Sequence, residues 1–263
     1  MKDRASAKLP RQDIIITMLP KGAHVHDAFT NSSSGLLAIA KSSKSKIFIE
    51  SSTIDVKTSL AVGEEVKKSG LGLFVDAPVS GGPNGAIAGS LTFMIGTDDQ
   101  ELEKKVRSVL NTMGKKESIF HCGPAGAGLA TKQINNYLSA VAILGVSEAM
   151  NMGVRYGLDP KILAGVINVS SGKCYNSLDQ NPVKGVTPTA ASAKDFEGGF
   201  SMELCMGVID MAVGLGQVVG AKSVLADIVQ DTFGRGLKDD RTRGKDCRSI
   251  YRLFAEDDGH ALD

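Results

Sequence analysis

Short apolar runs rich in β-branched residues recur through the first half of the chain. The run at 13–19 is apolar from Ile14 to Ile16 and is followed by Pro20, which is typical of a buried parallel strand and its exit turn. Four similar runs lie at 46–50, 73–78, 91–96 and 118–121. We therefore expect five strands in this part of the chain.

Helical patterns separate these runs. Thr53 or Asp55 can cap a helix that runs to about Ser69, and Asp98–Asp99 can open one that runs to Met113. Strands that alternate with helices and are joined by short turns containing Gly or Pro are typical of an α/β unit. Its sheet is expected to be mainly parallel.

The pattern changes near residue 123. No proline interrupts a helical pattern from Ala125 to Tyr156, a length of about 30 residues or ~45 Å of helix. Globular helices usually run about 8–20 residues, so this one is expected to bridge two domains or to form the spine of the second. Every later segment is helical, at 160–170, 202–219, 223–237 and 246–254. The sequence therefore predicts an α/β domain at 1–122 and an all-helical domain at 123–263.

Composition narrows the classes of protein. The 263 residues carry 30 Lys+Arg against 29 Asp+Glu, a net charge of +1, which argues against a protein that binds polyanions. A hydrophobic fraction of 42% and a charged fraction of 22% exclude a disordered chain. No uninterrupted apolar run of about 18 residues occurs, so we expect no membrane-spanning helix. The basic N-terminal stretch has no apolar core, so we expect no secretory signal.

Cysteines and histidines add little chemistry. The four cysteines contain no CxxC pair, so we expect reduced, mostly packed thiols of an intracellular protein. The spacing of His24 and His26 would suit a metal, but no cysteine or acidic cluster accompanies them. We therefore expect these histidines in a surface loop and expect no metal site.

One loop is a candidate anion site. The segment from Asp76 to Pro83 follows an expected strand directly and contains Ser80, Gly81 and Gly82. Ligands bind at the carboxyl ends of strands in such sheets. Adjacent glycines allow backbone N–H groups to approach an anion closely, and the serine adds a hydroxyl donor. The alternative is an ordinary strand-exit turn.

The long helix carries a second candidate. Lys132 and Asn136 are four residues apart and share one helix face. A lysine can act as a general acid/base once partial desolvation lowers its pKa. The alternative is a solvated surface lysine. Gly126-Ala127-Gly128 imitates the start of a dinucleotide loop, but it lacks the last glycine, so we do not interpret it as one.

Taken together, these segments resemble the β-hydroxyacid dehydrogenase family, most closely its 3-hydroxyisobutyrate dehydrogenase branch. The resemblance covers nearly the whole chain from about Asp13. It is carried, in order, by Thr17-Met18-Leu19-Pro20, Ser51-Ser52-Thr53, Asp76-Ala77-Pro78-Val79-Ser80-Gly81-Gly82, Gly126-Ala127-Gly128 leading to Lys132-Gln133-Ile134-Asn135-Asn136, Glu148-Ala149-Met150-Asn151-Met152-Gly153 and Gly198-Gly199-Phe200.

The resemblance implies a catalytic site. Ser80, Gly81 and Gly82 would hold a substrate carboxylate, and Asn136 would contribute. Lys132 would be the general acid/base that takes the hydroxyl proton. The implied reaction is the oxidation of a small 3-hydroxy acid, 3-hydroxyisobutyrate to methylmalonate semialdehyde in valine catabolism.

The resemblance also implies a cofactor, a fold and an assembly. Leu19, Pro20 and Thr53 would line a nicotinamide dinucleotide, NAD with NADP not excluded. The fold would be a partial Rossmann-type doubly wound sheet at 1–122, followed by a helical substrate and dimerisation domain at 123–263 with a long interdomain helix. We expect a homodimer or homotetramer, with no nucleic-acid or membrane partner. Localisation would be mitochondrial, with a cytoplasmic location as the alternative because no clear presequence is visible.

Departures from the family pattern leave alternatives open. Asn135 stands where 6-phosphogluconate dehydrogenases have a histidine, and imine reductases usually replace the lysine that this chain keeps. Glyoxylate or tartronate semialdehyde reductases share both loop and lysine and remain open. Gly207-Val208 occupies the place of a family Lys-Asp pair whose lysine contacts the cofactor, and Lys194-Asp195 lies upstream as a candidate substitute.

The start of the chain is the larger departure. The family opens with a strand and a glycine-rich turn that receives the pyrophosphate. At ~30 residues per βαβ unit, we expect roughly 60–80 residues of the nucleotide-binding domain to be absent. The competing hypothesis is therefore an inactive truncated isoform or fragment that acts only as an assembly module.

Overall fold

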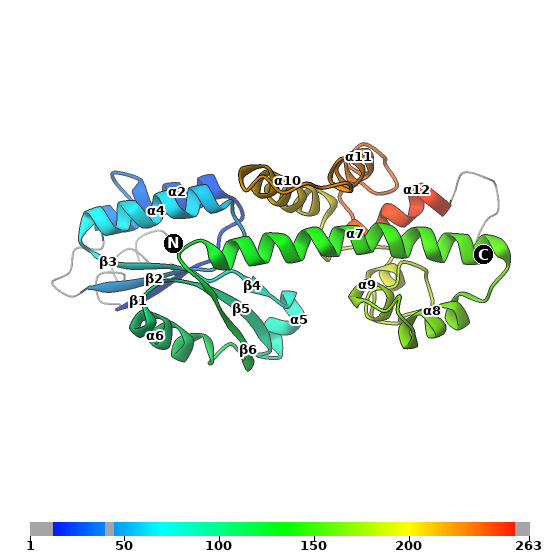
Figure 1. The fold of residues 1–263 in the computed structure, drawn as a ribbon, viewed down its shortest axis with the longest axis horizontal. Coiled ribbons are helices and arrows are strands. Elements are labelled where there is room, and N and C mark those ends of the chain that lie inside the picture. The colour runs from blue at the N-terminus through cyan, green and yellow to red at the C-terminus, as the bar shows by residue number, and fades with distance from the viewer. Residues whose placement is uncertain (1–12, 40–44, 256–263) are drawn as a thin grey trace. The chain divides into compact units, whose positions relative to one another are not determined.

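The computed structural model describes residues 13–39 and 45–255 (Figure 1). By its contacts the chain divides into two compact units, residues 1–134 and 135–263, with the boundary inside one helix. The described elements of the first unit are β1 (Ile14–Thr17), α2 (Gly22–Thr30), α3 (Leu36–Ile39), β2 (Lys46–Glu50), α4 (Val56–Ser69), β3 (Gly72–Asp76), β4 (Val79–Ser80), α5 (Gly82–Ile87), β5 (Leu91–Gly96), α6 (Gln100–Leu110), β6 (Gly114–Gly123) and the start of α7 (Ala127–Tyr156).

The six described strands form one sheet. Its order is β1-β2-β3-β5-β4, with β6 also pairing β5. The pairs β1·β2, β2·β3 and β5·β6 are parallel, whereas β5 runs antiparallel to β3 and β4. All five expected strands are present and the sheet is mainly parallel, but the reversed β5 was not foreseen. The segment between β3 and β5 holds only β4 and the short α5, and β4 pairs back onto β5 as in a hairpin.

Helices cover both faces of this sheet, which confirms the doubly wound expectation. Adjacent residues of β2 alternate between the faces, so Phe48 and Ile49 enter different clusters. Phe48 joins residues of α2, α3, α4 and α7, and its ring meets Phe29 edge-on at 5.6 Å. Ile49 joins Leu102 and other residues of α6. Figure 1 shows α6 on the face of the sheet opposite α2 and α4.

Capping residues set the helix starts much as expected. Asp55 caps α4 by accepting from the Thr58 N–H at 2.8 Å, and Asp99 caps α6 by accepting from two N–H groups. Helix α6 ends at Leu110, three residues before the expected end. The expectation of a surface loop at His24 and His26 was wrong. Both lie exposed on α2, whose inward residue Val25 is fully buried.

The second unit is helical, as expected. Beyond the remainder of α7 its described elements are α8 (Pro160–Val169), α9 (Tyr175–Leu178), the 3-10 helix η2 (Ala191–Lys194), α10 (Met202–Val218), α11 (Ala226–Gly236), the 3-10 helix η3 (Cys247–Tyr251) and α12 (Arg252–Ala255). One core cluster joins α7 to α10, α11 and η3 around the fully buried Met202, Ile209 and Phe233. The four cysteines are free, as expected.

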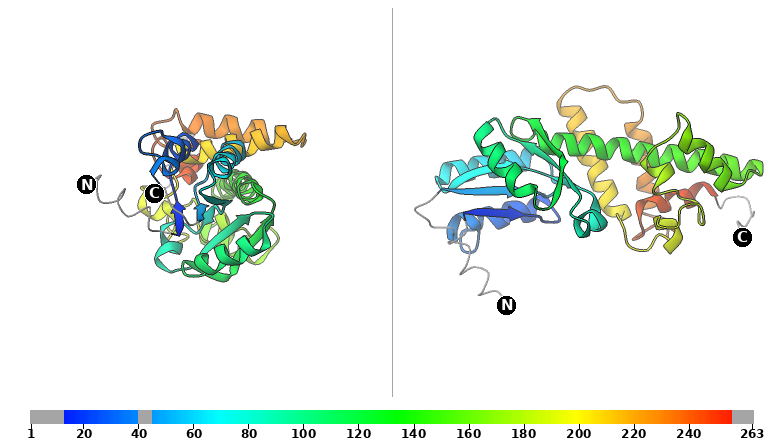
Figure 2. Two further views of the ribbon diagram at one scale, coloured as in Figure 1. Left: turned by 90° about the vertical axis from the view of Figure 1, so that its left-hand side faces the viewer. Right: turned by 90° about the horizontal axis from the view of Figure 1, so that it is seen from below.

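Helix α7 is a single helix of 30 residues (Figure 2). Within the described residues it is the one helix long and apolar enough to cross a membrane by length and composition, although it contains no uninterrupted apolar run of that length. The core helix of a soluble protein meets the same criterion. Its apolar side chains Leu129, Ile143 and Met150 are buried in three different core clusters.

Candidate active site

The segment after β3 that contains Ser80, Gly81 and Gly82 has two successive residues with left-handed backbone. Ser80 is half-buried and pairs with Thr92 of β5, while Gly81 and Gly82 are exposed. Both glycines have positive φ angles, 126° and 59°, which side chains rarely allow. This conformation favours glycine at positions 81 and 82, so two successive residues of the turn have no side chain.

Lys132 is the unusual charged residue of this region. It lies in the second turn of α7 and is 8% exposed. Burial lowers the pKa of its ammonium group to about 8, because the charged form loses hydration. Asn136, one turn further along α7, is half-buried. An amine that titrates near neutrality is suited to proton transfer, so the solvated-lysine alternative does not hold for Lys132.

Two side-chain contacts tie the start of α7 to β3 and to the segment between β2 and α4. The Asp76 carboxylate accepts hydrogen bonds from the N–H groups of Gly126 at 2.7 Å and Leu129 at 2.9 Å. The Gln133 amide donates to the Ile54 carbonyl at 2.9 Å. Since Asp76 also begins the loop that contains Ser80, loop and lysine helix start from the same end of the sheet.

A buried network joins the turns after β1 and β2. The Leu19 N–H donates to the Ser52 hydroxyl at 2.7 Å, and the Ser52 N–H donates to Glu50 Oε1 at 2.5 Å. The Thr17 hydroxyl donates to Glu50 Oε2 at 2.6 Å. Glu50 is fully buried, and burial raises the pKa of its carboxyl while these hydrogen bonds oppose the rise. Leu19 and the segment before Thr53 are therefore held together.

The same turn contains an unpaired polar atom. The Ser51 hydroxyl is buried and, among the described residues, has no hydrogen-bond partner. Buried hydroxyls are normally paired, so this one is available to a polar ligand lying across the strand ends. Three parallel strands end beside it, which is where doubly wound sheets bind nucleotides. The residues present thus fit the polar groups of a dinucleotide.

Glu50, Asp76 and Gln133 were given no role from the sequence alone. A signal for the first two was present: each is an acid at the last position of an apolar strand. They are register partners in the β2·β3 pair, so two buried carboxyls stand side by side at the strand ends. Buried acids are rare without a partner, which makes the pattern informative.

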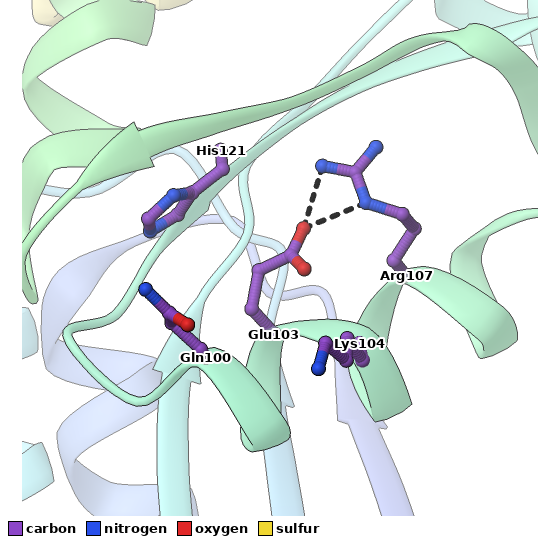
Figure 3. Close-up of a pocket in the computed structure, with 5 residues that line it drawn as sticks. All are labelled: Gln100, Glu103, Lys104, Arg107 and His121. Atoms are coloured by element: carbon purple, nitrogen blue, oxygen red, sulfur yellow. Dashed lines mark hydrogen bonds and ion pairs between the residues drawn. The ribbon is translucent and has the colours of Figure 1, made fainter.

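A pocket between α6 and β6 is a competing place for a ligand (Figure 3). It is lined by Gln100, Glu103, Lys104, Arg107 and His121. Two of its charges already neutralise each other, because the Arg107 Nε donates to Glu103 at 2.6 Å. The His121 Nε2 is hydrogen-bonded to the Thr97 carbonyl oxygen at 2.8 Å. No residue of the loop, of α7 or of the β1 and β2 turns lines it, so we do not assign the active site there.

Gly207-Val208, which stands in place of the family Lys-Asp pair, lies in a helix of the second unit. Gly207 lies in α10, where an added Cβ would meet nothing within 4 Å, and Val208 is buried. Lys194 is exposed, and its neighbour Asp195 pairs with Lys245 at 3.3 Å and with Arg252. Among the described residues, no group of three or more His, Cys, Asp or Glu could hold a metal ion.

Comparison with known proteins places these features in a family. Residues 2–123 match the NAD binding domain of 6-phosphogluconate dehydrogenase, and residues 126–254 match the NAD-binding domain of NADP-dependent 3-hydroxyisobutyrate dehydrogenase. Both halves thus match domains that bind a nicotinamide dinucleotide.

Individual relatives agree. The chain is 43% identical over 194 residues to the mitochondrial 3-hydroxyisobutyrate dehydrogenase of Bos taurus, covering 74% of this chain and 56% of that protein. It is 36% identical over 248 residues to the human mitochondrial enzyme of the same name, covering 94% of this chain and 71% of that protein. The structure of Mycobacterium tuberculosis 3-hydroxyisobutyrate dehydrogenase with L-serine has a TM-score of 0.84 at 33% identity, covering 95% of this chain and 82% of that one. The chain therefore belongs to the β-hydroxyacid dehydrogenase family, close to its 3-hydroxyisobutyrate dehydrogenase branch.

Proposed function

We propose that this protein oxidises a small 3-hydroxy acid, with 3-hydroxyisobutyrate as the leading substrate and methylmalonate semialdehyde as its product. The observation that carries the proposal is Lys132, a buried amine with a lowered pKa on a helix anchored beside the Ser80 loop. Mitochondrial valine catabolism is the proposed setting, because the curated relatives are mitochondrial enzymes of that name.

Each residue has one task in the proposed reaction. The neutral amine of Lys132 takes the proton of the substrate hydroxyl as the hydrogen on the same carbon leaves as hydride. Ser80, Gly81 and Gly82 hold the substrate carboxylate through the serine hydroxyl and backbone N–H groups, and Asn136 orients the substrate. The bound nicotinamide supplies the hydride acceptor.

The cofactor face is assigned to the turns after β1 and β2. Leu19 and Pro20 lie in the first turn and Thr53 in the second, and the Ser52 hydroxyl joins the two turns. The buried Ser51 hydroxyl is the group that we expect a bound dinucleotide to satisfy. These residues bind and orient the cofactor and take no part in the proton transfer.

A substrate and cofactor panel tests this function. Dinucleotide reduction is followed with 3-hydroxyisobutyrate, L-serine and glycerate, each with NAD and with NADP. We expect the highest kcat/KM with 3-hydroxyisobutyrate; preference for glycerate would support a tartronate semialdehyde reductase instead. Calorimetric titration with each dinucleotide accompanies the panel. No binding at millimolar cofactor would refute the dehydrogenase and favour a non-enzymatic assembly module.

The pH dependence of turnover follows from Lys132. The neutral amine accepts the proton during oxidation, so kcat should rise with pH through the lysine pKa of about 8. In the reverse direction the ammonium donates, so the reduction rate should fall as pH rises through the same value. Stopped-flow rates in both directions from pH 6 to about 10 measure this. Parallel profiles in the two directions would contradict the assignment.

Assembly is proposed to be homodimeric or homotetrameric. Helix α8 exposes Ile162, Val166 and Val169 at 69%, 57% and 87%, an apolar stripe that a second copy can cover. Light scattering decides the point, since a monomer at all concentrations would contradict it.

A further inference from the structure

The Asp76 carboxylate is a buried charged group that the proposed mechanism does not use. It is 1% exposed and stands at the end of β3. Each of its two oxygens accepts a hydrogen bond from a backbone N–H group at the start of α7, Oδ1 from Gly126 and Oδ2 from Leu129. These donors lie 50 and 53 residues away along the chain, so the contact joins parts of the fold that sequence proximity does not join.

Three glycines make this contact possible. A Cβ on Gly96 would collide with Asp76 Oδ1, and a Cβ on Gly128 would lie 2.8 Å from Oδ2 and collide with the Met94 carbonyl. Gly126 has a φ of 87°, and a Cβ there would come within 2.9 Å of Val56. Glycine at these positions lets the backbone close around the carboxylate. Gly126-Ala127-Gly128 is thus a cradle for an internal carboxylate.

The electrostatics of the contact are those of a helix N-terminus. The first N–H groups of a helix have no partner within the helix, and the helix dipole favours a negative charge beside them. Burial raises the pKa of the Asp76 carboxyl, and the N–H groups of Gly126 and Leu129 oppose the rise. Burying a carboxylate is unfavourable unless it is hydrogen-bonded. The folded state therefore favours keeping the N–H groups of Gly126 and Leu129 in contact with Asp76.

Asp76 lies between the two parts of the proposed active site, the helical turn that carries Lys132 and the Ser80 loop. Leu129 is three residues before Lys132, so its N–H belongs to the helical turn that precedes the lysine. Asp76 itself is four residues before Ser80, at the root of the substrate loop. A displacement of α7 by about 1 Å can lower a rate about 10²-fold when it moves a reacting group.

We propose that Asp76 is the positioning residue of the active site, setting the place of Lys132 relative to the Ser80–Gly82 loop by anchoring the first turn of α7. It touches neither substrate nor cofactor. This assignment rests on the proposed role of Lys132, but the anchoring itself can be measured without turnover.

Asp76→Asn tests the proposal. The amide keeps the side-chain size but places an NH2 group against one of the two backbone N–H donors. We expect the first turn of α7 to loosen, Lys132 to gain water, and its pKa to move from about 8 upward toward 10.5. NMR titration of lysine Cε signals, assigned with Lys132→Arg, follows this directly. In the active enzyme kcat should fall about 10–100-fold, with the acid limb of the oxidation profile moved to higher pH.

Asp99→Ala is the matched control. It removes a carboxylate that accepts from two N–H groups, those of Glu101 and Leu102, at the start of α6 in the same unit. The Lys132 titration and kcat should stay at wild-type values in this variant. An equal shift in both variants would mean that any lost cap disturbs Lys132, and the assignment would be overturned.

The remaining outcomes also decide. A folded Asp76→Asn protein with the wild-type Lys132 titration overturns the proposal. Absent turnover in the wild type refutes the dehydrogenase but leaves the titration as a test of anchoring. If Asp76→Asn does not fold, hydrogen exchange of the backbone amides in the wild-type protein tests the anchor instead. The Leu129 N–H should then exchange as slowly as the Ala130 N–H, which donates a hydrogen bond to the Gly126 carbonyl at 3.0 Å. Fast exchange at Leu129 would refute the anchor.

Discussion

Replacing Lys132 by alanine should lower kcat by about 10²–10⁴-fold, the range for losing a general acid/base. The amine is 8% exposed, and burial holds its pKa at about 8, so its neutral form is abundant at mildly alkaline pH. Without it the substrate hydroxyl loses the proton acceptor that we propose for it. Steady-state rates with saturating dinucleotide and 3-hydroxyisobutyrate measure the loss.

Control variants distinguish the loss of the Lys132 amine from the loss of its side-chain volume. Lys132→Met retains much of the buried volume and should be as slow as Lys132→Ala, because both lack the proton acceptor. The pH dependence of oxidation near 8 should disappear in both variants. Lys68→Met, on the exposed face of α4, should leave kcat unchanged. If Lys132→Ala keeps the wild-type kcat, the lysine has no part in the mechanism.

Local patterns were sufficient to predict most elements. Continuous apolar runs located five strands, and Asp55 and Asp99 marked helix starts, because caps and apolar runs are local properties. The missed elements are those with weak local signals. Strand β4 has two residues, and the direction of β5 depends on its pairing with β3 and β4.

Candidate site residues divide in the same way. Ser80 and Lys132 were noticed by residue type and spacing, and the resemblance gave them roles. Glu50, Asp76 and Gln133 act through partners far along the chain. Gln133 reaches a carbonyl 79 residues away and Glu50 a hydroxyl 33 residues away. Such contacts depend on how β1, β2 and β3 align at one sheet edge, which a single sequence does not display.

The glycines of α7 yield the second large prediction, because the same substitution should have opposite effects at two positions. At Gly128 an added Cβ would collide with the Met94 carbonyl and lie 2.8 Å from Asp76 Oδ2, both in the rigid interior. Overpacking of this kind costs about 1–3 kcal/mol or more. At Gly145 an added Cβ would meet nothing within 4 Å. Alanine there should stabilise by about 0.5–1 kcal/mol through helix propensity.

Thermal and urea unfolding of Gly128→Ala and Gly145→Ala measures the pair. We expect a lower midpoint for Gly128→Ala and a higher one for Gly145→Ala, with kcat reduced only in the former because the Asp76 contact precedes Lys132 by one helical turn. Equal stabilisation in both variants would mean that α7 does not approach β5 and Asp76 closely. A stability loss at Gly128 with full activity would separate the packing of α7 from the placement of its lysine.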